Sequence, residues 1–108
     1  MSEKKVLGLL GLAQKAGKTA DGGFSVEQVL KAGRAKLVIA AEDASVNTKK
    51  KYTELCQKAS CPLLILSNKQ ELAHAIGKEE RSGIAILDKS FADAIIKQAE
   101  TFTVNRGE

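Results

Sequence analysis

The stretch KLVIAA, residues 36–41, decides the fold class of this 108-residue chain. Its five consecutive apolar residues lack the alternation of a half-exposed strand and are typical of a strand that is covered on both faces. Two shorter runs of the same kind, at residues 63–66 and 84–87, predict two more buried strands, and residues 18–21 predict a short extended segment. The sequence therefore predicts four strands.

Helical patterns separate these strands. Apolar residues recur at the spacing of one helical face, and glycine or a short polar residue stands where such helices end or begin. The patterns predict a first helix from Val6 to Gly17 and a second that ends at Gly33 and has Val26, Val29 and Leu30 facing inward. A third helix is predicted from Asn47 or Thr48. A fourth is opened by a capping box of Ser67 and Gln70 and ends near Gly77, and a fifth starts at Ser90. This order is typical of an α/β fold, a three-layer α/β/α sandwich around a mostly parallel, mixed four-stranded sheet.

Length and composition predict a single domain, residues 1–108. Hydrophobic residues make up 44% of the chain and there is one proline, which indicates a compact globule without linkers. No apolar run approaches the roughly 18 residues of a membrane span, and the N-terminus lacks the pattern of a secretion signal. We therefore expect a cytoplasmic protein that does not bind membranes.

Residues 11–19, GLAQKAGKT, end in Gly-Lys-Thr and suggest a nucleotide-binding phosphate loop. That loop needs four residues between its glycines, whereas five separate Gly11 from Gly17. A buried strand precedes such a loop, but the residues before this one have helical spacing. We therefore interpret Gly17 as a helix terminator with Lys15 in the last turn, and Gly11 as a point of close helix packing.

The two cysteines and the single histidine form neither a zinc site nor a disulfide framework. Cys56 falls on the apolar face of a helix, Cys61 precedes a proline at the entry to a strand, and His74 lies in another helix. Cysteines in such positions are usually buried and inert. We expect structural thiols, a partly exposed His74, and no metal or other cofactor.

Charge is distributed unevenly along the chain. Residues 1–51 carry ten Lys or Arg and five Asp or Glu, whereas residues 52–108 carry seven and eight. A basic first half favours nucleic acid as a partner. The alternative, that scattered lysines only keep a small protein soluble, stays open at this point.

The glycine pair Gly22-Gly23 is a candidate phosphate site. Glycine admits positive φ and lets a foreign backbone approach closely. The helix that follows presents free N–H groups and a partial positive charge, which hold a phosphate without any catalytic residue. Lys15, Lys18 and Lys31 could lie close enough to add charge.

The same segment also has a purely structural interpretation. Ser25 and Gln28 match a capping box, and Phe24 with Val29 match the hydrophobic staple that often accompanies it. A capped N-terminus uses some of the N–H groups that a phosphate would need. Both interpretations stay open from these residues alone.

Five segments resemble those of a known family: LLGLAQKAGKTADGG (9–23), KAGRAKLVIAAEDAS (31–45), NTKKK (47–51), SNKQELAHAIGKEERSGIAILD (67–88) and FA (91–92). They are similar to bacterial YlxQ-like proteins, a branch of the kink-turn RNA-binding superfamily of large-subunit ribosomal proteins of the seven-Ae and thirty-e type. The resemblance covers nearly the whole chain. It implies an α/β/α sandwich that binds structured RNA and has no known catalytic activity.

The resemblance also implies where RNA would bind. Members of the family use a Gly-x-Asn-Glu-x-x-Lys pattern at the start of the second helix. Aligned on the glycine that ends this helix, the pattern places its glycine at Gly22 and puts Phe24, Ser25 and Gln28 where the family has Asn, Glu and Lys. The family's second contact is the loop before the last strand, residues 78–82, which here also contains two glutamates.

The leading hypothesis is a non-catalytic, ribosome-associated RNA-binding protein. Its expected partners are structured RNA, ribosomal RNA in the first place, and the ribosome or translation factors, with no small-molecule substrate. The residues expected to contact RNA are Lys15, Lys18, Gly22, Gly23, Phe24, Ser25, Gln28, Lys31, Lys69, Lys78, Arg81 and Ser82.

Two other hypotheses stay open. The first is a protein-interaction module on the same fold that has lost specific RNA recognition and that binds through a patch around Phe24. The second is an enzyme acting on a nucleotide or phosphorylated metabolite, for which Glu42 and Asp43, directly after a buried strand, are the candidate acids. The family resemblance favours RNA binding over both.

Overall fold

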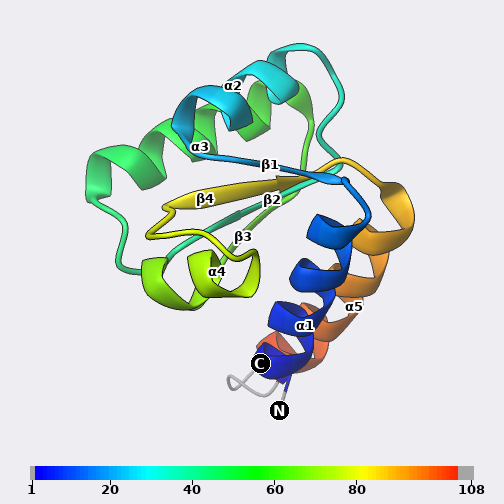
Figure 1. The fold of residues 1–108 in the computed structure, drawn as a ribbon. Coiled ribbons are helices and arrows are strands. Elements are labelled where there is room, and N and C mark those ends of the chain that lie inside the picture. Colours follow the sequence, from blue (N-terminus) through cyan, green and yellow to red (C-terminus); the bar gives the residue numbers. More distant parts are fainter. Residues whose placement is uncertain (1, 105–108) are drawn as a thin grey trace.

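The computed structural model describes residues 2–104, which form five helices and four strands (Figure 1). In chain order the elements are α1 (Ser2–Lys15), β1 (Thr19–Asp21), α2 (Gly23–Lys31), β2 (Leu37–Ala40), α3 (Val46–Ala59), β3 (Leu63–Ile65), α4 (Lys69–Ala75), β4 (Gly83–Ile86) and α5 (Lys89–Val104). Helices α2 and α3 cover one face of the sheet, and α1, α4 and α5 lie on the other (Figure 1). The predicted three-layer α/β/α sandwich is confirmed. Within these residues no helix is both long and apolar enough for a membrane span.

The sheet has the strand order β1-β4-β2-β3. Strands β2 and β3 pair in parallel, whereas β4 runs antiparallel to both of its neighbours, β1 and β2. Three of the four strands therefore point the same way, and the prediction of a mixed sheet is confirmed. The reversed strand lies between two of them, however, so that only one of the three pairings is parallel.

The loop after α4 explains why β4 is reversed. The Arg81 N–H donates to the Lys69 carbonyl at the start of α4 (3.3 Å), so residues 77–82 double back along that helix. The chain returns to the end of the sheet at which β3 stops, and β4 enters from there. A parallel strand would need a crossover that carries the chain back to the other end, as α3 does between β2 and β3.

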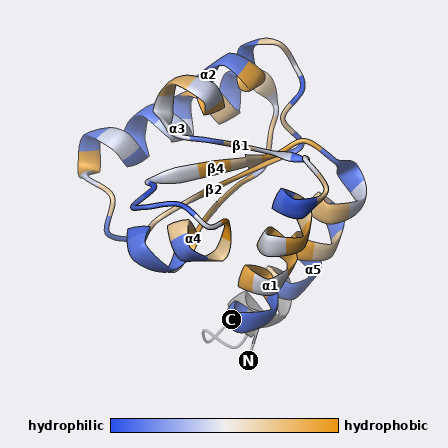
Figure 2. Ribbon diagram, in the orientation of Figure 1, coloured by the Kyte–Doolittle hydropathy of each residue, from blue (hydrophilic) through white to orange (hydrophobic). Residues whose placement is uncertain are grey.

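The core has two halves, one on each face of the sheet. The side chains of β2 alternate between them: Leu37 and Ile39 pack with α1, α4 and α5, and Val38 and Ala40 pack with α2 and α3. All four are completely buried. This explains the unbroken apolar run, which Figure 2 shows in orange along β2, because neither face of this strand meets water.

The glycines of the first helix have the roles that their positions predict. Gly17 adopts φ +71° two residues after the end of α1 and prevents the helix from continuing, with the Lys18 N–H donating to the Ala13 carbonyl (2.9 Å). A Cβ on Gly11 would lie 3.1 Å from the Ala75 carbonyl oxygen, so α1 packs closely on the end of α4 there. A helix and not a strand precedes Gly-Lys-Thr, which rules out the phosphate loop.

Helix α1 starts four residues before the predicted Val6, and the starts of α3 and α4 also differ from the prediction. Ser45 caps α3 by accepting the Thr48 N–H (3.1 Å), and Asn68 caps α4 by accepting the Glu71 N–H (2.8 Å). The predicted cap of α4, Ser67, instead has φ +63° and is buried. Ser67 and Asn68 are adjacent short polar residues that both fit the pattern of an N-cap. The positive φ of Ser67 is not the extended conformation of an N-cap, so Asn68 caps the helix.

Candidate functional site

The turn between β1 and α2 is built around Gly22. This residue has φ 90° and ψ 154°, a conformation that favours glycine. Its N–H donates to the Gly83 carbonyl (3.3 Å), and its own carbonyl accepts the Val26 N–H (3.0 Å). Helix α2 therefore starts directly beside β4, with its first turn held against the beginning of that strand.

The start of α2 has no side-chain cap, and the predicted capping box is wrong. The helix begins at Gly23, so Ser25 lies inside the first turn and cannot serve as the N-cap. Phe24 is 75% exposed and therefore forms no hydrophobic staple. The physical reason is the glycine pair, which lets the helix begin directly after the turn. The first-turn N–H groups are left to solvent or a ligand.

Side chains from three elements line a hollow of about 420 Å³ at this turn. Four of the residues predicted to contact RNA, Gly22, Gly23, Arg81 and Ser82, meet here. The hollow is completed by residues that the sequence did not single out as contacts: Asp21, Thr48, Tyr52 and Glu80. The structure thus joins the β1–α2 turn to the loop before β4, although some sixty residues separate them in the sequence.

Tyr52 is the fixed wall of this hollow. It is 3% exposed, and a Cβ on Gly83 would come within 2.6 Å of its ring and hydroxyl. Burial raises the pKa of the Tyr52 phenol, because the charged form would lose its hydration. Glycine at the first position of β4 is therefore required by the close approach of this ring.

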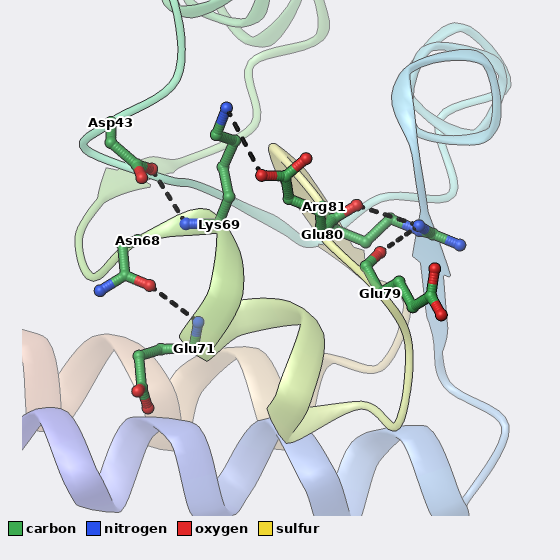
Figure 3. A network of polar contacts seen from close by, with 7 residues as sticks. All are labelled: Asp43, Asn68, Lys69, Glu71, Glu79, Glu80 and Arg81. Atoms are coloured by element: carbon green, nitrogen blue, oxygen red, sulfur yellow. Dashed lines mark hydrogen bonds and ion pairs between the residues drawn. The ribbon is translucent and has the colours of Figure 1, made fainter.

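Arg81 ties the loop of residues 77–82 to β1. Its Nε donates to the Asp21 carboxylate at 2.7 Å. Its Nη1 donates to the carbonyls of Glu79 and Glu80, as Figure 3 shows. Its side chain is only 32% exposed. Arg81 was predicted to contact phosphate, but the structure gives it a structural task as well: it fixes the loop beside the glycine turn.

The other two cations of this region that were predicted to contact RNA, Lys69 and Lys78, also lie near acidic groups. Lys69 Nζ lies 4.0 Å from the Glu80 carboxylate (Figure 3). Lys78 lines a separate hollow of about 570 Å³ over α4, together with Glu71, Glu79, Glu80 and other polar side chains. Lys69 and Arg81 thus each have a carboxylate partner and Lys78 lies among glutamates, so the loop before β4 has little excess positive charge.

The side chain of Asp43 has a structural role, whereas Glu42 contributes its backbone carbonyl. The Asp43 carboxylate accepts the backbone N–H of Lys69 at the start of α4 (2.9 Å), and the Glu42 carbonyl accepts Lys49 Nζ (2.9 Å). Across residues 2–104 there is no group of three or more acidic, histidine or cysteine side chains arranged to hold a metal ion. These contacts tie the segment after β2 to α3 and α4.

Lys15, Lys18 and Lys31 do not lie beside the glycine turn, so that prediction is wrong. The Lys18 carbonyl accepts the Leu87 N–H (2.8 Å) at the far end of β4, and Lys31 is the last residue of α2. The turn lies at one end of the sheet, and the segments that follow α1 and α2 lie at the other (Figure 1). The three residues of β1, a length of about 10 Å, separate Lys18 from the turn.

The remaining predicted contacts, Ser25 and Gln28, lie along the exposed side of α2. Together with Lys31 they line a third hollow, of about 830 Å³, which also includes Thr19 and Arg34. This hollow follows α2 from its first turn to its end. Arg34 was not predicted as a contact, and its position beyond the helix terminator gives no sequence signal of its own.

Cys56 and Cys61 are buried free thiols, as predicted. Their side chains interact: the hydrogen bond with Cys61 raises the pKa of Cys56, and the same contact lowers that of Cys61. Lys36 lies near enough to lower the Cys61 pKa further. His74 is exposed on α4, which agrees with the prediction. These three residues lie apart from the hollow at the glycine turn.

Comparison with known proteins agrees with this architecture. The RNA-binding protein YlxQ of Bacillus subtilis (strain 168) is 40% identical over 96 residues, which cover 89% of this chain and 96% of that protein. A structure of a protein of unknown function from Bacillus halodurans has a TM-score of 0.86 at 35% identity and covers 89% of this chain and 97% of its own. The 15.5kD RNA-binding protein of Giardia lamblia shares the fold, with a TM-score of 0.79 at 16% identity over 93% of this chain and 86% of its own.

The sequence model of one family matches residues 4–96, which is most of the chain. This match and the 40% identity to YlxQ confirm the resemblance that the sequence motifs indicated. The chain belongs to the ribosomal protein L7Ae/L30e/S12e/Gadd45 family.

Proposed function

We propose that this protein is a non-catalytic, ribosome-associated RNA-binding protein of the cytoplasm. Structured RNA would bind at the glycine-turn surface, which we define as Gly22, Gly23, Phe24, Ser25 and Ser82. The similar protein from Bacillus subtilis is named as RNA-binding, and the matching family is one of ribosomal proteins. The observation that carries the proposal is an exposed Phe24 on an uncapped helix start.

The glycine-turn surface offers two kinds of contact to RNA. The uncapped N–H groups of the first turn of α2 can hold a phosphate, and no atom lies within 4 Å of where a Cβ on Gly22 or Gly23 would be. The Phe24 ring can stack on an unpaired base, which is the usual way in which proteins recognise single-stranded parts of a folded RNA. Ser25 and Gln28 can donate to or accept from base edges and sugars.

This chemistry differs from the hydrogen-bonding pattern of the wider family. Asn and Glu side chains suit the edges of sheared base pairs, but Phe24 has no hydrogen-bonding group and Ser25 is short and uncharged. We therefore propose that stacking and backbone contacts dominate binding. An RNA with an unpaired base next to a bend should bind as well as one with the sheared pairs of a kink-turn.

The substitution Phe24→Ala tests this function. Loss of one base–aromatic stack costs about 1–3 kcal/mol, which lowers affinity for an RNA hairpin with a kink-turn about 5- to 160-fold. Thermal stability should not change, because the ring makes little contact with the fold. The matched control is Leu12→Ala, since Leu12 is another exposed apolar side chain and lies on α1. Equal affinities of the two variants in a fluorescence titration would contradict the proposal.

A protein-interaction module is the second candidate function. Phe24 and Val46 are 75% and 78% exposed and stand near the starts of α2 and α3, which are apolar positions that a protein partner could cover. This function predicts that purified protein binds no RNA in the titration above. It also predicts that Phe24→Ala removes a protein from those that co-purify with the tagged chain in cells.

A further inference from the structure

The end of the sheet opposite the glycine turn carries a group of exposed basic residues. Lys18 precedes β1 and Lys36 precedes β2, and both backbones are fixed to β4, because the Lys18 carbonyl accepts the Leu87 N–H (2.8 Å) and the Lys36 N–H donates to the Ile86 carbonyl (2.7 Å). Since β4 lies between β1 and β2, the two lysines stand about 10 Å apart at this end of the sheet.

Two more basic residues and the end of α2 complete this group. The Arg34 N–H donates to the Val29 carbonyl (2.9 Å), which holds Arg34 at the end of α2. Lys15 lies in the last turn of α1, three residues before Lys18, near the same end of the sheet. We define the far basic surface by its five members: Lys15, Lys18, Lys31, Arg34 and Lys36.

Most of these charges have no acidic partner. Among the described residues, the only member of the far basic surface in an ion pair is Lys31, which lies 3.0 Å from Glu27 and is still 68% exposed. Asp88, the acid next to the end of β4, accepts the Phe91 N–H at the start of α5 (3.0 Å). The far basic surface therefore has the excess positive charge that the loop before β4 lacks.

The hollow along α2 connects the two ends. It is lined by Ser25 and Gln28 near the start of the helix and by Lys31 and Arg34 at its end. The nine residues of α2 span about 13 Å, a length that can accommodate several phosphates of an RNA strand. Its volume of about 830 Å³ is twice that of the hollow at the turn.

We propose that RNA bound at the glycine turn continues along this hollow and that its phosphates contact Lys18, Arg34 and Lys36. This second contact rests on the RNA-binding function proposed above and extends it to the opposite end of the molecule. Lys31 and Arg34 line the hollow where α2 ends, and the exposed Lys18 and Lys36 lie at the same end of the sheet, so a polymer with regularly spaced charges that leaves the hollow there would meet several cations. An acidic protein segment would also need a buried apolar anchor, and the hollow is lined mainly by small and polar side chains.

The test compares two fluorescent RNAs in a binding titration at several salt concentrations. One is a hairpin with a kink-turn, and the other is the same hairpin with eight added unpaired nucleotides. The variant is Lys18→Glu with Arg34→Glu, and the charge-matched control is Lys4→Glu with Lys5→Glu, two exposed lysines at the start of α1. Thermal unfolding checks that both variants are folded.

The far-surface variant should lower affinity for the extended RNA at least tenfold beyond the control. Its salt dependence, the slope of log affinity against log salt, should fall by about 1.4, because each contact with a single strand contributes about 0.7. Affinity for the short hairpin should change no more than in the control.

Three results would overturn this inference. The variant and the control could lower affinity for the extended RNA equally, or the variant could leave that affinity unchanged. Polyglutamate of equal charge could also bind as tightly as the extended RNA. Each of these results differs from failure of the proposed function. In that case either the wild-type protein binds neither of the two RNAs, or Phe24→Ala does not change affinity for the short hairpin.

Discussion

Replacing Gly83 by alanine tests how rigidly the wall of the glycine-turn hollow is built. The new Cβ would lie 2.6 Å from Cζ and Oη of Tyr52, so the ring must shift although it is only 3% exposed. Overpacking of this kind costs about 1–3 kcal/mol, part of a total stability of roughly 5–15 kcal/mol. For a domain of this size that corresponds to a fall in the unfolding temperature of about 4 to 20 °C.

The assay is thermal unfolding together with tyrosine fluorescence, because Tyr52 is the single tyrosine and the chain has no tryptophan. The emission of Gly83→Ala should change as the ring moves, and in a Tyr52→Leu background the same substitution should cost much less. The matched control, Gly8→Ala, adds a methyl group where no atom lies within 4 Å in exposed helix and should stabilise α1 by up to about 1 kcal/mol. Wild-type stability and unchanged fluorescence in Gly83→Ala would refute the reasoning.

Two further predictions concern the same region. Arg81→Gln removes the tether to Asp21, so amide hydrogen exchange in residues 77–82 should accelerate while β2 stays protected; unchanged exchange would show that the ion pair does not hold the loop. Because burial raises the Tyr52 pKa, the unfolded chain loses this proton first, so stability should fall as pH rises above about 10. In denaturant unfolding at pH 9 to 11, the free energy of unfolding of Tyr52→Phe should therefore fall less than that of the wild type. Equal pH profiles for the wild type and Tyr52→Phe would contradict the assignment.

The elements that the sequence predicted well are those whose signals are local. The apolar run at β2 requires burial on both faces, and the structure buries both. Gly17 and Gly33 end helices with φ +71° and +72°, as expected where a left-handed residue follows a helix. Gly11 indicated close packing, because a glycine inside a helix otherwise costs stability. The Ala75 carbonyl lies so close to Gly11 that a larger residue would crowd it.

The features that the sequence did not reveal depend on contacts between distant segments. The reversal of β4 depends on the contact between Arg81 and Lys69, which no local pattern encodes. The basic first half of the sequence suggested one basic face around the glycine turn, but β1 carries the chain from Lys18 to the opposite end of the sheet. Asp21 could be recognised as part of the site only once the fold placed it beside Arg81.

Photocrosslinking of bound RNA to the wild-type protein, with the attached residues identified by mass spectrometry, tests the central claim most directly. The account predicts crosslinks in residues 19–31, with Phe24 prominent because its ring would stack on a base, and in residues 78–83. Crosslinks confined to the outer faces of α1 and α5, with none in these two segments, would contradict it.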